Sequence, residues 1–126
     1  LTPLQNFEKG KSIFYPQGYS NYFFHPTHPH ELIIVSTENN KVSILNCLSG
    51  EIVRTISKGK EYAFCNIDPV TGNYLFRNSY YALITNENGD ELFRMRSEDT
   101  SPYLANNILT CWAGAAINVE PYLKKP

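Results

Sequence analysis

The sequence predicts a mainly β fold, with antiparallel strands and hairpins in one compact domain and at most one short helix. Aromatic residues make up 13% of the 126 residues, and nearly all are Tyr or Phe, which favour pleated, half-exposed surfaces. Short apolar or alternating runs are separated by Gly, Pro and Asn, as strands are separated by turns. No stretch keeps an apolar period of 3.6 residues over three turns, which an amphipathic helix would show.

The expected strands are short and follow one another closely. Residues 31–37, ELIIVST, form a β-branched apolar run that is typical of a buried strand. In residues 41–47 apolar and polar side chains alternate, so they are expected to point to opposite faces of a sheet. The full set of expected strands is Lys11–Tyr15, Asn21–Phe24, Glu31–Thr37, Lys41–Cys47, Glu51–Ile56, Glu61–Ile67, Tyr74–Arg77, Ser79–Thr85 and Glu91–Arg96.

The last two of these strands are expected to form a hairpin. Asn88 and Gly89 lie between them, and an Asn-Gly pair supplies the positive φ angles that a type I′ turn requires. The segments that follow are less regular. Residues 107–112 are mainly apolar, and residues 113–119, AGAAINV, are small and apolar, which fits either a short helix or a packed strand.

Two segments of the chain, residues 20–56 and 60–96, look like copies of one unit. A shift of 40 residues superposes the pairs Tyr22 and Tyr62, Phe24 and Phe64, Pro29 and Pro69, Ile44 and Ile84, Asn46 and Asn86, Glu51 and Glu91, and Arg54 and Arg94. A period near 40 residues with several short strands in each copy is typical of blade-type β architectures.

Within each unit an aromatic strand is followed by a Pro turn, an apolar strand, an alternating strand, a Gly turn and a closing strand. In this order residues 20–95 resemble two blades of the WD-repeat or kelch-like propeller style, although neither unit has the Trp-Asp or Gly-His pair. The resemblance implies a blade-type fold. Because a propeller needs about four to eight blades, three interpretations stay open: a fragment, a ring closed by copies of this chain, or one compact sheet with a blade-like rhythm.

A second resemblance covers residues 61–111. The strand EYAFCNI, the segment YYALITNENG and the late Leu109-Thr110-Cys111 are similar to strands of the secreted ribonuclease-like effectors of powdery mildews. That resemblance implies Glu61 as a base and Arg77 or Arg94 as phosphate ligands. The chain lacks the Tyr-x-Cys motif of these effectors and has no His after His30. It therefore implies a scaffold without catalysis, whose target would be a host protein or RNA.

Charge and composition narrow the partner classes. Eleven basic and twelve acidic residues leave a net charge of −1, which argues against a dedicated nucleic-acid binder. No apolar run approaches the length of a membrane span, so no membrane partner is expected.

Three cysteines fit either three buried thiols or one disulfide and one thiol. The chain begins with Leu1, so either a processed N-terminus or a chain trimmed from a longer one is expected, and both secreted and cytoplasmic locations stay open.

The sequence offers no catalytic motif. It has no Gly-x-Ser-x-Gly elbow and no phosphate loop, so neither a catalytic residue nor a cofactor is expected. The three histidines fall in HPTHPH, where Pro26 and Pro29 hold the backbone extended and separate neighbouring side chains. We therefore expect a surface loop here and no metal ion.

The function that fits these observations is a non-enzymatic, β-rich binding protein that acts through loops and edge strands. Its expected partner is another protein, with RNA and self-association as further alternatives. Tyr is favoured at interfaces because it is large and amphipathic. The expected contact residues are Tyr19, Tyr22, His25, His28, His30, Tyr80, Tyr81 and Trp112.

Overall fold

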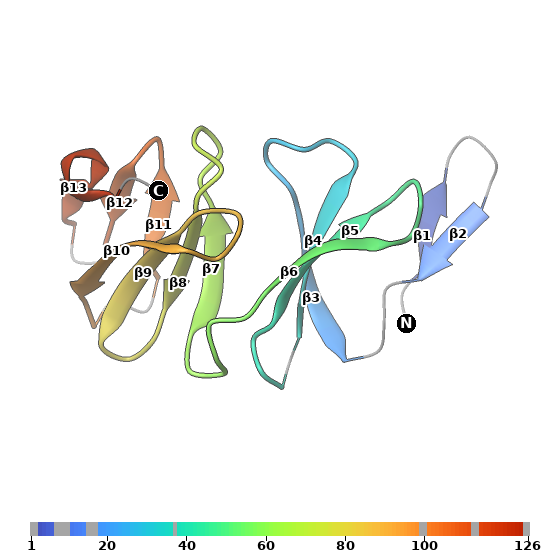
Figure 1. Cartoon of the computed structure of the whole chain (residues 1–126), viewed down its shortest axis with the longest axis horizontal. Coiled ribbons are helices and arrows are strands. Elements are labelled where there is room, and N and C mark those ends of the chain that lie inside the picture. Colours follow the sequence, from blue (N-terminus) through green and yellow to red (C-terminus); the bar gives the residue numbers. More distant parts are fainter. Residues whose placement is uncertain are drawn as a thin grey trace. The chain divides into compact units, whose positions relative to one another are not determined.

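The computed structural model confirms the mainly β fold (Figure 1). It describes residues 3–6, 11–14, 18–36, 38–98, 101–111 and 114–124. Within these residues every strand pairing is antiparallel, and the helical part is one 3₁₀ turn, η1, at Glu120–Tyr122. The chain divides into two compact units, Leu1–Lys60 and Glu61–Pro126. The number of domains stays a prediction.

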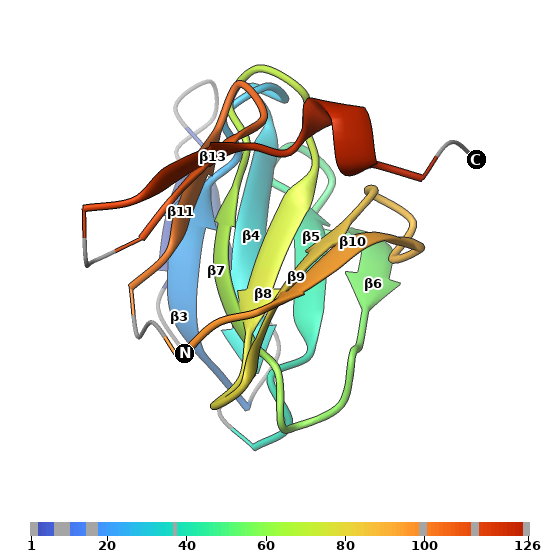
Figure 2. The same ribbon diagram turned by 90° about the vertical axis from the view of Figure 1, so that its left-hand side faces the viewer.

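The first unit contains a two-stranded and a four-stranded sheet. The small sheet pairs β1, Pro3–Asn6, with β2, Lys11–Phe14. The larger sheet has its strands in sequence order, so that each connection is a hairpin and the two edges are its first and last strands (Figure 2). These strands are β3 at Tyr19–Phe24, β4 at Glu31–Ser36, β5 at Val42–Asn46 and β6 at Ile52–Ile56.

The second unit again has a four-stranded sheet and adds a three-stranded sheet. Its four-stranded sheet again has the strands in sequence order. They are β7 at Ala63–Ile67, β8 at Tyr74–Arg77, β9 at Tyr81–Thr85 and β10 at Glu91–Arg96. A three-stranded sheet follows, with β11 at Tyr103–Ala105, β12 at Ile108–Thr110 and β13 at Ala116–Asn118.

The expected strands agree with this architecture. Those at Tyr74–Arg77 and Glu91–Arg96 have the observed bounds, and the others differ at their ends by one or two residues. The expected last residues Tyr15 and Thr37 lie outside the described residues. The short strands β1, β11 and β12 were not predicted. In the segment 113–119, where helix and strand were both open, the structure has the strand β13.

All six hairpin turns of the two four-stranded sheets begin with a side chain that accepts backbone hydrogen bonds. In each turn this side chain accepts from the N–H group two residues further along the chain, and from another one or two residues beyond that. Such local bonds fix a tight reversal without help from the rest of the fold. The capping residues are His25, Ser36, Asn46, Asp68, Asn78 and Asn86.

The hairpin between β9 and β10 is confirmed, but its predicted type I′ turn is wrong. Only Gly89 has a positive φ, of +88°, and Asn88 does not. The Asn86 cap holds a longer turn instead, in which Gly89 N–H donates to the Asn86 carbonyl and Asn86 N–H donates to the Asp90 carbonyl. The type I′ pattern occurs between β11 and β12, where Asn106 and Asn107 have φ angles of +51° and +61°.

The strand ladders correct the alignment on which the predicted repeat was based. Ile44 lies opposite Ile33 and Ile84 lies opposite Leu75, so these two isoleucines occupy equivalent positions. Arg54 lies opposite Ile44, whereas the residue opposite Ile84 is Phe93 and not Arg94. Only two of the seven superposed pairs are structurally equivalent. Ile44 and Ile84 occupy the same position in their ladders, and Asn46 and Asn86 make the same backbone hydrogen bond in their turns. The repeat itself stays a prediction.

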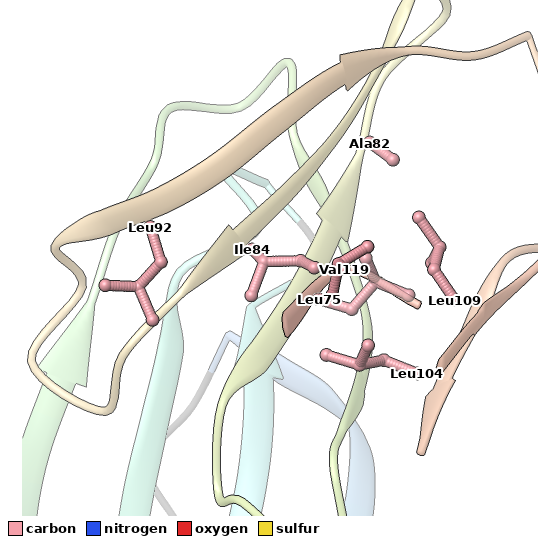
Figure 3. Close-up of a cluster of buried hydrophobic side chains, with 7 residues drawn as sticks. All are labelled: Leu75, Ala82, Ile84, Leu92, Leu104, Leu109 and Val119. Atoms are coloured by element: carbon pink, nitrogen blue, oxygen red, sulfur yellow. The ribbon is translucent and has the colours of Figure 1, made fainter. Parts of the chain in front are cut away.

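The core of the second unit lies between its two sheets. Leu75 and Ile84 project from the four-stranded sheet toward Leu104 and Leu109 of the three-stranded sheet, and Val119 closes the cluster (Figure 3). All five side chains are fully buried. A smaller cluster in the first unit is formed by the buried Leu32, Ile34 and Leu45.

Asn66 of β7 and Asp68, the residue that follows β7, hold the β11–β12 hairpin in place. Asn66 Nδ2 donates to the Leu104 carbonyl at 2.9 Å, and Leu104 N–H donates to Asn66 Oδ1 at 3.1 Å. The fully buried Asp68 carboxylate accepts from Asn106 N–H at 2.8 Å and from Asn107 N–H at 2.9 Å. The three-stranded sheet is thus attached to the four-stranded sheet of the second unit by polar bonds as well as by its apolar face.

The cysteines Cys47, Cys65 and Cys111 are half-buried thiols, which answers the question that the sequence left open. Burial raises the pKa of the Cys47 thiol, which lowers its reactivity. Among the described residues, no helix is long and apolar enough to cross a membrane.

Candidate interaction surface

Arginine and tyrosine side chains gather where β9 begins and β10 ends. Arg94 and Arg96 are alternate residues of β10, so they project from the same face of the sheet. The Arg94 guanidinium lies 5.5 Å from the ring centre of Tyr62 and 5.2 Å from that of Tyr81, and the Arg96 guanidinium lies 5.7 Å from that of Tyr80. These distances are typical of cation–π contacts. We call these five residues the Tyr–Arg cluster.

The two arginines of the Tyr–Arg cluster differ in their electrostatic partners. Arg94 forms an ion pair with Glu91 at 2.9 Å and also donates to the Tyr62 hydroxyl. The Glu91 bond raises the pKa of Arg94, burial opposes the shift, and the Tyr62 bond adds to it. Within the described residues, no carboxylate lies at ion-pair distance from Arg96. Of the two arginines in the cluster, Arg96 is thus the one without an ion pair to a described carboxylate.

The turn that carries Tyr80 and Tyr81 is held rigidly. Asn78 Oδ1 accepts from both tyrosine N–H groups, at 2.8 and 2.7 Å. Ser97 N–H donates to the Tyr80 carbonyl at 2.7 Å and ties the turn to the end of β10. Tyr80 is nevertheless 55% exposed. The cluster therefore presents an exposed aromatic ring beside a cation on a preorganised backbone.

The expected contact residues in the first unit play different roles. Tyr19 is half-buried, and its hydroxyl lies 2.8 Å from Ser43 Oγ, which in turn lies 3.1 Å from Thr55 Oγ1. These hydroxyl groups form a chain of hydrogen bonds across the four-stranded sheet. The Tyr19 hydroxyl therefore has a structural role. Tyr22 is exposed on the edge strand β3, beside the exposed Phe24.

The histidines lie in the turn between β3 and β4, where the sequence predicted a surface loop, but the side chain of His25 is buried, with 7% exposed. The ring centres of His25 and His28 are 4.3 Å apart, and their ring nitrogens and a Glu31 oxygen lie within 4.8 Å of one another. His25 Nδ1, however, accepts from the N–H groups of Thr27 and His28, so in the neutral ring the proton is on Nε2. A metal-binding histidine normally has the opposite arrangement. Glu31 is also paired with Arg54 at 2.8 Å.

The structure thus brings together two of the expected contact residues, Tyr80 and Tyr81. It adds Tyr62 and Arg96, which sequence reasoning missed, and Arg94, which was named only as a phosphate ligand. Alternate arginines in a predicted strand are a signal that could have found the pair. His30 is exposed in the β3–β4 turn, outside this cluster. Trp112 lies outside the described residues.

The chain is similar in structure to BamB from Moraxella catarrhalis, a β-propeller-type protein, with a TM-score of 0.54 and 17% sequence identity. The match covers 85% of this chain and 33% of that chain, so the chain spans about a third of the length of BamB. No family model and no curated protein matches. At this identity the similarity establishes the fold alone. The four-stranded antiparallel sheets fit a blade-like architecture, and closure into a propeller stays a prediction.

Proposed function

We propose that this chain is a non-enzymatic, blade-like binding module whose Tyr–Arg cluster contacts another protein. The observation that carries the proposal is the pairing of the exposed Tyr80 ring with Arg96, a cation without an acidic partner in the described part of the chain. Tyr and Arg, together with Trp, are enriched among the residues that dominate binding energies at protein interfaces. The Asn78 bonds reduce the entropy that a flexible turn would lose on binding.

The chemistry of the cluster indicates a protein surface with an acidic side chain next to an apolar one. An aspartate or glutamate can meet Arg96, and an apolar side chain can cover the Tyr80 ring. Arg94 is less available because Glu91 already neutralises it. The ribonuclease-like alternative has no support in the fold comparison. RNA is therefore not part of the proposal and is tested only in the cleavage assay below.

The experiment begins with the tagged chain and crosslinking mass spectrometry to identify a bound protein, followed by calorimetry with that purified protein. Tyr80→Ala and Arg96→Ala are each expected to weaken binding at least ten-fold, whereas Tyr122→Ala, which removes a tyrosine elsewhere that is 64% exposed, should not. Circular dichroism checks that each variant is folded. Unchanged affinity in both cluster variants would refute the proposal.

A cleavage assay separates the enzyme class from this proposal. Incubation of the chain with RNA should give no turnover. Turnover that Glu61→Gln abolishes would show that the protein is a nuclease and not a binding module.

A further inference from the structure

The last strands of the two four-stranded sheets, β6 and β10, can be compared position by position. Leu45 lies opposite Ile52 and Ile44 lies opposite Arg54, so Val53 is an extra residue in β6. In the same way Thr85 lies opposite Glu91 and Ile84 opposite Phe93, so Leu92 is an extra residue in β10. Val53 and Leu92 are therefore equivalent bulge positions on the outer edges of the two sheets.

The outer edge of β10 is covered by the chain itself. Lys124 N–H donates to the Leu92 carbonyl at 2.8 Å. The Tyr122 ring lies 6.1 Å from the Phe93 ring, and Leu123 packs against the core cluster of the second unit. As a result, Leu92 is only 8% exposed. The segment after β13 thus protects this edge from pairing with another strand.

No described segment covers the outer edge of β6 in this way. Val53 is 46% exposed and Ile52 is 39% exposed. Asn46 N–H donates to the Glu51 carbonyl, and by the alternation of an antiparallel ladder the backbone of Thr55 then faces away from β5. Among the described residues, no strand pairs with this outer edge, and no backbone hydrogen bond from outside the ladders reaches Val53 or Thr55.

The charged residue of this edge is held away from it. Proteins usually guard an edge strand with a projecting charge, a proline or a covering segment. Arg54 is the one charged residue of β6, and its Nη2 is bound to Glu31 Oε1 of β4 at 2.8 Å. The guanidinium therefore lies across the face of the sheet and does not project beyond its edge.

We infer that β6 is a self-association edge, along which two copies of this chain pair β6 with β6 to extend the four-stranded sheet. The strand IVRTI is rich in β-branched residues, which favour pairing, and a net charge of −1 gives little repulsion between copies. A twofold axis, the commonest symmetry of homodimers, makes the two strands antiparallel. This inference is independent of the proposed function, because it uses neither the Tyr–Arg cluster nor its partner.

Charge also selects the register of the pairing. With Arg54 on the axis, two arginines would lie directly opposite each other, which is unfavourable. With the twofold axis at Thr55, the outward-facing N–H and C=O groups of Thr55 in the two copies lie opposite each other. It places Arg54 opposite Ile56 of the partner copy and Val53 opposite Ser57 of the partner copy. This register forms backbone bonds at Thr55 and leaves the ion pair between Arg54 and Glu31 intact.

Sedimentation velocity of the purified chain tests the pairing directly. A reversible monomer–dimer equilibrium is expected as the concentration rises. Val53→Lys should raise the dimer dissociation constant at least ten-fold. Val70→Lys is the matched control, since Val70 is 64% exposed in the β7–β8 turn and lies on no sheet edge. A monomer at every concentration, or a dimer that Val53→Lys leaves unchanged, would overturn the inference.

Crosslinking tests the register. Two Cα atoms opposite each other at the axis are close enough for a disulfide. Thr55→Cys should therefore give a covalent dimer under mild oxidation, above the background that Cys47, Cys65 and Cys111 give in the unmodified chain. Val70→Cys should stay at that background. Equal crosslinking in both variants would contradict pairing at Thr55.

Discussion

Asp68→Asn is the change for which the structure gives the sharpest expectation. The Asp68 carboxylate is fully buried and accepts four backbone N–H groups: those of Val70 at 2.8 Å, Thr71 at 3.3 Å, Asn106 at 2.8 Å and Asn107 at 2.9 Å. It thus caps its own turn and at the same time holds the turn between β11 and β12. An amide has the same shape but only one accepting oxygen.

The expected loss of stability depends on the hydrogen bonds that the amide cannot accept. Whichever way it is turned, its NH₂ group faces at least one backbone N–H, so a buried donor loses its acceptor. Hydrogen bonds to a charged group contribute about 1.5–3 kcal/mol, and an unsatisfied buried donor costs about 1–3 kcal/mol. We expect Asp68→Asn to lower the free energy of unfolding by about 3 kcal/mol. Asp68→Ala, which removes every acceptor, should lower it by about 4 kcal/mol.

The pH dependence gives a second test of the same bonds. Burial alone would raise the pKa of Asp68, but backbone bonds from Asn107, Val70 and Asn106, with the contact to Thr71, bring this pKa below its ordinary value. A carboxyl group whose pKa is lower in the folded state stabilises the fold above its unfolded pKa of about 3.9. That contribution is lost as the pH falls through the folded pKa. Asp68→Asn should therefore remove part of the acid sensitivity of the protein.

Urea unfolding followed by far-UV circular dichroism at pH 7 and at several acidic values measures both effects. Amide hydrogen exchange at Asn106 and Asn107 shows whether the loss begins at the β11–β12 turn. The matched control is Glu98→Gln, the same change at an exposed position. A stability change below about 0.5 kcal/mol in Asp68→Asn would mean that these four bonds do not hold the turn, and the reasoning would fail.

Three further changes test other parts of the fold, each by urea unfolding. Asn66→Ala removes both bonds to Leu104 and should lower the free energy of unfolding by about 1–3 kcal/mol, with faster hydrogen exchange at Leu104. Ile84→Ala empties a fully buried place in the core cluster and should lower it by about 2–5 kcal/mol. Gly72→Ala meets no atom within 4 Å but forces a side chain to a φ of +80°, so a loss of about 1–2 kcal/mol is expected, and Gly72→Asn should lose less.

Most of the strand pattern could be predicted because it depends on local chemistry. Alternation places Val42 and Ile44 on one face, and short polar side chains begin the turns. The strand β11 gives little local signal, because three residues, Tyr103–Ala105, are too few for a period. It is held by Asn66, 38 residues earlier in the chain, and no local pattern shows such a bond.

The predicted repeat indicated blade-like sheets although most of its residue pairs are not equivalent. Pro29 was superposed on Pro69, but Pro69 follows the capping residue Asp68 and its counterpart is Pro26, which follows the capping residue His25. The first unit has a second Pro, Pro29, in the same turn, so a wrong offset still pairs two prolines. Similar composition at similar spacing is enough to indicate an architecture, whereas equivalence of single residues depends on the ladders.

The candidate site depends on one extra residue that sequence patterns do not reveal. The bulge at Leu92 places Arg94 opposite Leu83 and Arg96 opposite Tyr81. Without it, the regular ladder from Glu91 would place Phe93 opposite Leu83 and would bring Arg94 to the core face opposite Ala82. The same bulge thus buries the apolar residues of β10 and directs both arginines toward the tyrosines. Tyr80 and Tyr81 can be named from composition and turn position, but the cations beside them follow only from this register.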